Sequence, residues 1–144
     1  MTTLVRHMLV GKTEVFAVRP DDTVLAALRL MAEKNIGAVM VLDGDQPAGI
    51  LSERDYARKM VLHGKSSRDT TVSEVMTSPL ISVEPDWSCD RCMALMTDKH
   101  IRHLPVLNGD ALLGVLSIGD VVKAVISEKQ FLIEQLESYI TSSG

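Results

Sequence analysis

The sequence contains one internal repeat, and that repeat limits what the chain can fold into. When Pro20 is aligned with Pro85, an offset of 65 residues, segment 18–55 matches segment 83–120 without an insertion. Identical residues run through the whole alignment, from Pro-Asp at its start to Gly-x-x-Ser-x-x-Asp at its end. A tandem duplication of this kind predicts two similar folding units.

Each half has the pattern of a β-α-β-β-α unit. A short strand (14–18; 80–83) ends at Pro-Asp, and the following segment places apolar residues at i, i+3, i+4 and i+7, as in an amphipathic helix. Two apolar runs follow, joined by Asp-Gly in one half and Asn-Gly in the other, which is the strongest short signal for a hairpin. A second helix is expected to start at Ser52 and Ser117. The fold class is therefore α/β (α+β).

Three segments lie outside the repeats: a short N-terminal segment, a polar linker, and a helix from about Ser127. The expected division is repeat 1 with the N-terminal segment at 8–65, repeat 2 at 73–127 and the last helix at 128–144. That helix carries an apolar stripe, which must be covered by the chain's own core or by a partner: Phe131, Leu132, Leu136, Tyr139 and Ile140.

Composition excludes several classes of protein. The chain has 144 residues, enough for one domain or two small subdomains, and a net charge of −4 with no run of Lys or Arg. Such a chain is a poor candidate for nonspecific nucleic-acid binding. It shows no apolar run long enough to cross a bilayer and no signal peptide pattern, so we expect a cytoplasmic protein without membrane contact.

The motifs "GILSERD" (49–55) and "GVLSIGD" (114–120) allow two compatible interpretations. In the structural one, Ser52 and Ser117 cap a helix, and Asp55 and Asp120 form the other half of a capping box. In the functional one, each Asp accepts two hydrogen bonds from the vicinal hydroxyls of a ribose. A phosphate would then lie near the helix N-terminus.

The two repeats, "IRHLPV" in the second (101–106) and the two Gly-x-x-Ser-x-x-Asp endings together resemble paired CBS domains, the Bateman module. The resemblance covers about residues 8–127 and is closest to small stand-alone bacterial members. It implies two repeats packed with pseudo-two-fold symmetry and an adenosyl ligand in the cleft between them. That ligand would be AMP, ADP or ATP, or else NAD(H) or S-adenosylmethionine. It also implies a flat homodimer, with the Met-rich and C-terminal stripes at or near the interface, and a regulated partner protein of unknown identity.

The resemblance also implies roles for residues. Asp120 and Asp55 would hold ribose, and the ribose or phosphate contacts would come from Ser117, Ser52, Arg102, His103 and Arg54. The alternative for Arg102 and His103 is a surface Arg and a partly buried His. For the adenine pocket the alternative is ordinary core or loop, and its candidates are Lys12, Thr13, Val15, Phe16, Ala38, Val39, Thr77, Pro79, Leu80, Ile81, Leu104, Pro105 and Ile118.

The two halves differ where phosphate would bind. Gly37 and Ala38 stand where the second repeat has Arg102 and His103, so the first repeat lacks its own basic pair. Arg54 is a candidate substitute, as is Arg102 reaching across the cleft. We therefore expect tighter binding of a phosphate-bearing ligand at the Asp120 site.

The remaining motifs give no other chemistry. Cys89 and Cys92 form C-x-x-C, but they align with apolar Val24 and Ala27, which favours core packing over a redox or zinc site, and no metal is expected. The chain lacks the common nucleophile and nucleotide-binding motifs. We expect a regulatory binding module rather than an enzyme. The alternatives are an interaction scaffold with no physiological nucleotide and, less favoured, a nucleotide hydrolase.

Overall fold

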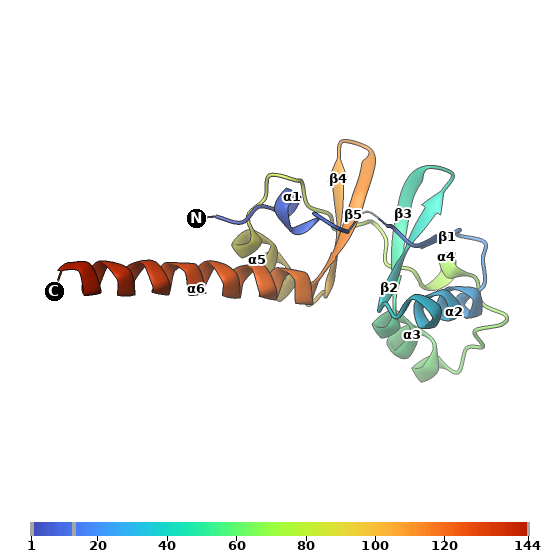
Figure 1. The fold of residues 1–144 in the computed structure, drawn as a ribbon. Helices are drawn as coiled ribbons and strands as arrows, with labels where there is room; N and C mark the ends of the chain where they lie inside the picture. The colour runs from blue at the N-terminus through green and yellow to red at the C-terminus, as the bar shows by residue number, and fades with distance from the viewer. Residues whose placement is uncertain (1, 13, 144) are drawn as a thin grey trace. The chain divides into compact units, whose positions relative to one another are not determined.

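A computed structural model describes residues 2–12 and 14–143 (Figure 1). The described residues divide into two compact units. One is Glu14–Ile81, which contains the first repeat. The other consists of the described residues within Met1–Thr13 and Ser82–Gly144, and it contains the second repeat. Each unit is described below by itself.

The first-repeat unit has a three-stranded sheet with helices packed against it. Its elements are β1 (Ala17–Val18), α2 (Val24–Lys34), β2 (Ala38–Asp43), β3 (Gln46–Ser52), α3 (Glu53–Lys59), the 3₁₀ turn η1 (Val61–His63) and α4 (Val72–Val75). The strand order is β1-β2-β3, with β1 parallel and β3 antiparallel to β2. This is the predicted β-α-β-β-α order, with the linker closing as one short helix.

The second-repeat unit repeats this arrangement. Its elements are α1 (Val5–Met8), α5 (Cys89–Lys99), β4 (His103–Asn108), β5 (Ala111–Ser117) and α6 (Ile118–Ser143). Strands β4 and β5 pair antiparallel, and an isolated parallel bridge joins Val83 to Val106, at the place where β1 meets β2 in the other unit. The expected strand at 80–83 is reduced to that bridge, and β1 is shorter than predicted.

The ends of the first helices show why the sequence folds this way. Thr23 and Ser88 cap α2 and α5 by accepting hydrogen bonds from the backbone N–H three residues on. Each helix ends at a left-handed residue, Asn35 (φ 54°) or His100 (φ 55°). The buried side chains of α2 are Val24, Ala27 and Met31, and those of α5 are Cys89, Cys92 and Met96. The predicted apolar faces are thus the buried ones.

The N-terminal segment packs with the second repeat, whereas the sequence division placed residues 8–13 with the first. The Val5 N–H donates to the Trp87 carbonyl (2.8 Å), as the Val72 N–H donates to the Asp22 carbonyl (2.8 Å). The N-terminal residues therefore do for the second repeat what α4 does for the first. The sequence repeat does not reveal this, because the N-terminal segment that completes the second repeat lies before the first repeat along the chain.

The last helix also differs from the prediction. The separate helix expected from about Ser127 is the continuation of α6, which runs unbroken from Ile118 to Ser143. The reason lies in composition, since no Pro or Gly stands between Gly119 and Gly144 to interrupt the helix.

Candidate functional site

The Ser-x-x-Asp sequence forms a capping box in both units. Ser52 Oγ accepts from the Asp55 N–H (3.1 Å), and Asp55 Oδ2 accepts from the Ser52 N–H (2.9 Å). Ser117 Oγ accepts from the Asp120 N–H (3.3 Å), and Asp120 Oδ2 accepts from the Ser117 N–H (2.7 Å). These bonds satisfy orphan N–H groups at the start of α3 and α6 and fix both carboxylates in one orientation. The capping interpretation of the motif is confirmed.

The Asp55 carboxylate has further partners on its other oxygen. Oδ1 accepts from Thr77 Oγ1 (3.0 Å) and lies 3.3 Å from Lys59 Nζ, which also donates to the Val75 carbonyl (3.1 Å). The Asp55 side chain is 13% exposed. A largely buried carboxylate therefore joins the end of β3 to the chain that follows α4.

The Asp120 carboxylate is ion-paired with Lys12, which comes from the N-terminal segment. The Asp120 side chain is 23% exposed. Burial raises the pKa of this carboxyl, but the hydrogen bonds from Lys12 and from Ser117 outweigh it and hold the pKa below its ordinary value. Asp120 is therefore ionised at neutral pH and acts as a hydrogen-bond acceptor.

The glycine of each motif is explained by the segment that crosses its strand. A Cβ on Gly49 would lie 2.9 Å from the Thr77 carbonyl oxygen and 2.7 Å from Met76 Sδ. A Cβ on Gly114 would lie 2.8 Å from Leu9 Cδ2. The glycines allow these segments to pass close over β3 and β5, which brings Thr77 to Asp55 and Lys12 to Asp120. The duplicated Gly, Ser and Asp thus act together: the glycine lets a second segment approach, and the Ser and Asp form the cap that this segment contacts.

The candidate phosphate ligands lie next to these caps. The Arg102 carbonyl accepts from the Ile118 N–H (2.8 Å), just as the Gly37 carbonyl accepts from the Glu53 N–H (3.0 Å). The Arg102 side chain is exposed, and His103 is half-buried at the start of β4. Arg54 is half-buried in the first turn of α3. The residue whose carbonyl bonds to the cap is therefore Arg102 in the second-repeat unit and Gly37 in the first, where Arg54 of α3 is the nearby basic residue.

The candidate adenine residues fall into groups by burial. Val39 belongs to the core cluster of its unit, and Phe16 packs against that cluster with Lys34 Nζ 5.3 Å from its ring centroid. Leu104 and Pro105 are also buried, and Thr13 lies outside the described residues. The others are half-buried or exposed: Lys12, Val15, Ala38, Thr77, Pro79, Leu80, Ile81 and Ile118. Their roles toward adenine stay a prediction.

Three partners of the carboxylates were not predicted from the sequence: Lys59, Lys12 and Thr77. Lys59 carried a signal, since it stands four residues after Asp55 on a predicted helix, the spacing of an ion pair. Lys12 was a candidate wall of the adenine pocket, but its contact with Asp120 was not foreseen. The signal for this contact in the sequence was the alignment of Lys12 with Thr77 when the two repeats are offset by 65 residues.

The two cysteines are buried and unpaired by disulfide. Cys89 Sγ donates a hydrogen bond to Glu128 Oε2, and these atoms lie within 4.8 Å of a carboxylate oxygen of Asp90. Burial, reinforced by Glu128, raises the pKa of Cys89 to about 12, and burial raises the pKa of Cys92 to about 11. Three ligand atoms are one fewer than a structural zinc site takes, and the raised pKa values favour protonated thiols.

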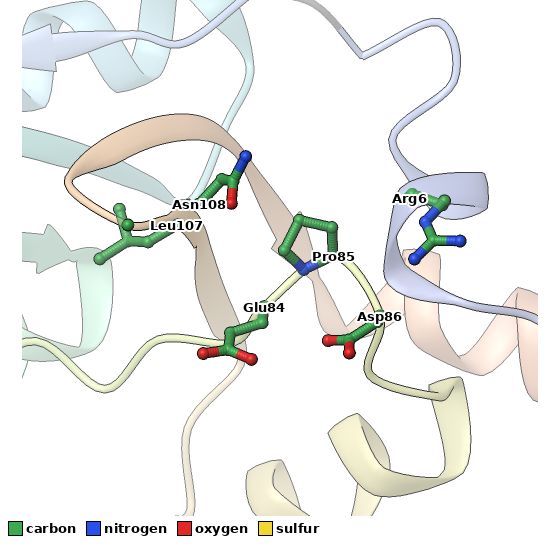
Figure 2. Close-up of a pocket in the computed structure, with 7 residues that line it drawn as sticks. Arg6, Glu84, Pro85, Asp86, Leu107 and Asn108 are labelled. Carbon is green, nitrogen blue, oxygen red and sulfur yellow. The ribbon is translucent and has the colours of Figure 1, made fainter.

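An open depression of about 420 Å³ lies elsewhere on the second-repeat unit (Figure 2). It is lined by Arg6 of α1, by residues 84–86 and by residues 107–109 at the β4–β5 turn. Figure 2 shows the Glu84 and Asp86 side chains next to Pro85, with Arg6 close by. Because Asp120 follows the opposite end of β5, this depression is separate from the carboxylate arrangement.

Comparison with known proteins identifies the class of both units. The CBS domain profile matches residues 5–62 and 72–127, that is, both repeats. The chain belongs to the CBS-domain family and carries a pair of these domains.

Three relatives illustrate the similarity. A CBS-domain protein from Burkholderia ambifaria MC40-6, of known structure, is 51% identical, with 87% of this chain and 95% of that chain covered and a TM-score of 0.84. CBS domain-containing protein CBSX3, mitochondrial, from Arabidopsis thaliana is 45% identical over 125 residues, 83% of this chain. This chain spans 61% of CBSX3's length. CBS domain-containing protein YhcV from Bacillus subtilis is 35% identical over 75% of this chain and 76% of its own.

Among residues 2–12 and 14–143, none of the helices combines the length and apolar character that crossing a bilayer needs.

Proposed function

We propose that this protein is a regulatory module that binds an adenosyl ligand, with Asp55 and Asp120 as the acceptors for ribose hydroxyls. The observation that carries the proposal is the duplicated carboxylate. Each unit fixes one Asp in the first turn of a helix, mostly buried and already accepting several hydrogen bonds. A ribose presents two adjacent O–H donors, and an ionised carboxylate accepts both.

The surroundings of Asp120 fit a phosphate-bearing ligand best. Its pKa is lowered, so it is ionised, and Lys12 supplies an ammonium group beside it. Arg102 lies next to the same cap through its carbonyl bond to Ile118. In the first-repeat unit the residue at the repeat offset is the neutral Thr77, and the ammonium group near Asp55 is that of Lys59. The first repeat also has Gly37 and Ala38 where the second has the basic pair Arg102 and His103. We therefore propose that the Asp120 site binds the phosphate-bearing ligand more tightly.

The ligand class follows from the family and from this chemistry. CBS pairs commonly bind adenosyl ligands, and AMP, ADP, ATP, NAD(H) and S-adenosylmethionine all carry the vicinal diol. The cations near Asp120 favour the phosphorylated members over S-adenosylmethionine, whose sulfonium is positive. The adenine pocket and its position between the repeats stay predictions. No metal is required by this chemistry.

The output of such a module is a change in another protein. A ligand that binds one of two states better shifts the population toward that state. The Burkholderia relative is assigned provisionally to signal transduction, and a CBS-CP12 protein with 28% identity is hexameric. We propose a non-catalytic, cytoplasmic role in which ligand binding alters a homo-oligomer or the contact with an effector protein.

A thermal-shift panel with AMP, ADP, ATP, NAD(H) and S-adenosylmethionine tests the proposal. A ligand at 100 times its dissociation constant stabilises the folded state by about 2.7 kcal/mol, so a binding nucleotide must raise the melting temperature. Adenine without ribose is the control and should have a smaller effect. No shift across the panel would favour the alternative, a scaffold in which the capping boxes and ion pairs are purely structural. Nucleotide turnover on prolonged incubation would support the hydrolase instead.

A further inference from the structure

Lys12 is positioned by a tight turn at the end of the N-terminal segment. The Lys12 N–H donates to the Leu9 carbonyl (2.8 Å), and Gly11 has φ 82°, a left-handed conformation that glycine adopts without strain. The turn passes over β5, where a Cβ on Gly114 would lie 2.8 Å from Leu9 Cδ2 and 3.7 Å from the Lys12 carbonyl oxygen. The turn therefore holds the Lys12 backbone beside β5, from which its ammonium group reaches Asp120.

The bonds to Asp120 converge on one of its two carboxylate oxygens. Oδ2 accepts from the Ser117 N–H (2.7 Å), from Ser117 Oγ (3.0 Å) and from the Lys12 ammonium group. A carboxylate oxygen has two lone pairs, so three donors exceed what Oδ2 accepts with good geometry. The two Ser117 bonds belong to the cap of α6 and are fixed by the start of that helix. Lys12 is therefore the donor that a ligand can replace.

The first-repeat unit distributes the corresponding contacts differently. Thr77 Oγ1 (3.0 Å) and Lys59 Nζ (3.3 Å) approach Asp55 Oδ1, whereas the cap bonds lie on Oδ2. Lys59 Nζ also donates to the Val75 carbonyl (3.1 Å), so it keeps an acceptor when the carboxylate binds another group. Lys12 differs, because Asp120 is the one hydrogen-bond acceptor of its ammonium group in the part of the chain that the structure describes.

A ribose at Asp120 competes with Lys12 for the carboxylate. The Lys12 side chain is 38% exposed and that of Asp120 is 23% exposed, so the pair is partly shielded from water. Separating it leaves a partly buried ammonium group without its acceptor, which is unfavourable. A phosphate attached to the same ribose offers that ammonium group a new charge-assisted bond, and an unphosphorylated nucleoside does not.

We propose that Lys12 is a specificity-determining residue, which favours adenosyl ligands that carry a phosphate and disfavours the same ligands without one. This inference rests on the proposed function and adds a selection step to it. In the ligand-free chain Lys12 pairs with Asp120, and in the complex it pairs with the phosphate. Asp55 has no equivalent exchange, because Thr77 is neutral and Lys59 retains the Val75 carbonyl.

Isothermal titration with AMP and with adenosine tests the selection step, because these ligands differ only in the phosphate. The wild type should bind AMP at least about 100-fold more tightly than adenosine. Lys12→Met keeps a side chain of similar length without the charge. It should weaken AMP binding about 10-fold, since one charge-assisted contact is lost, and strengthen adenosine binding about 3–10-fold, since no ion pair has to be broken.

Three further chains serve as controls. Lys12→Arg keeps the charge and should keep the preference for AMP within about fivefold of wild type. Arg6→Met removes an exposed charge from the same N-terminal segment and should leave both affinities unchanged. The titrations are repeated in the Asp55→Asn background, so that binding at the first repeat does not mask the Asp120 site. Melting temperatures and far-UV circular dichroism verify that every chain is folded.

The possible results distinguish the selection step from the proposed function. Loss of the AMP preference in Lys12→Met, with retention in Lys12→Arg, supports the role of Lys12. Binding of AMP with an unchanged preference in Lys12→Met, or equal binding of AMP and adenosine by the wild type, overturns that role and leaves the proposed function standing. Absence of binding by all of the folded chains overturns both.

Discussion

Lys12 is ion-paired with Asp120, although 108 residues separate them along the chain. Thr77 makes the corresponding contact with Asp55 in the other unit. The two donors align at the same offset as the rest of the repeat, yet one is cationic and one is neutral. The two repeats therefore share the acceptor carboxylate but differ in the donor that contacts it at this position.

The first prediction concerns the ion pair itself. Lys12→Gln should raise the Asp120 pKa toward its ordinary value, because it removes the largest favourable contribution to the ionised form. A carboxyl ¹³C NMR titration measures this directly. Arg6→Gln, which removes a charge from the same N-terminal segment, is the control and should leave Asp120 unchanged.

The same variant predicts a pH dependence of stability. Because the folded pKa of Asp120 lies below its unfolded value of about 3.9, the ionised group contributes stability above that pH. That contribution is lost as the pH falls through the folded pKa. The variant should be less stable than wild type by about 1 kcal/mol at pH 7, and the gap should close in acid. An equal gap at pH 7 and in strong acid would show that the ion pair does not cause it.

A second prediction compares the two glycines. Gly49→Ala should lower the free energy of unfolding by about 2–3 kcal/mol, because the new Cβ meets the backbone oxygen of Thr77. Gly114→Ala should cost about 1 kcal/mol or less, since its nearest atom is the end of the movable Leu9 side chain. Urea denaturation of both variants measures the difference. Equal losses would mean that the crossing segments are not held as described.

The cysteines give a third prediction. Burial keeps both thiols protonated at pH 8, reinforced at Cys89 by the contact with Glu128, so they should react with a thiol reagent only when the protein unfolds. Absorbance with Ellman's reagent should show almost no reaction in buffer and two thiols in guanidinium chloride. Rapid labelling of the native protein would contradict the burial of Cys89 and Cys92.

A fourth prediction concerns the asymmetry of ligand binding. Asp120→Asn should weaken binding of a phosphorylated adenosyl ligand about 10–100-fold, as expected for losing hydrogen bonds to a charged acceptor. Asp55→Asn should weaken it less, because the first repeat has Gly37 and Ala38 in place of the basic pair Arg102 and His103. Isothermal titration of both variants, with melting temperatures as folding controls, checks this. Equal losses of affinity in the two variants would contradict the predicted difference between the two sites.

The repeat made much of the fold predictable from sequence. Hairpins appear where Asp43-Gly44 and Asn108-Gly109 predicted them, with both glycines at φ 64°. The helix starts at Ser52 and Ser117 are confirmed by their capping bonds. These features depend on local chemistry that a short segment carries by itself.

Features that depend on distant contacts were harder to predict. The pairing of the N-terminal segment with the second repeat joins Val5 to Trp87, and nothing local in either segment encodes it. The contact of Lys12 with Asp120 follows from that pairing. The unbroken α6 was missed for a different reason, since the stripe after Ser127 suggested a separate element although no residue there breaks a helix.

The central claim is that the duplicated carboxylates hold the ribose of an adenosyl ligand. A crystal structure of the protein soaked with AMP or ATP tests it most directly. The account predicts ribose hydroxyl oxygens within 2.5–3.0 Å of the Asp120 carboxylate, at hydrogen-bond distance, with Lys12 displaced from Asp120 or turned toward the phosphate. A bound nucleotide remote from both Asp120 and Asp55, with Lys12 still paired to Asp120, would contradict it.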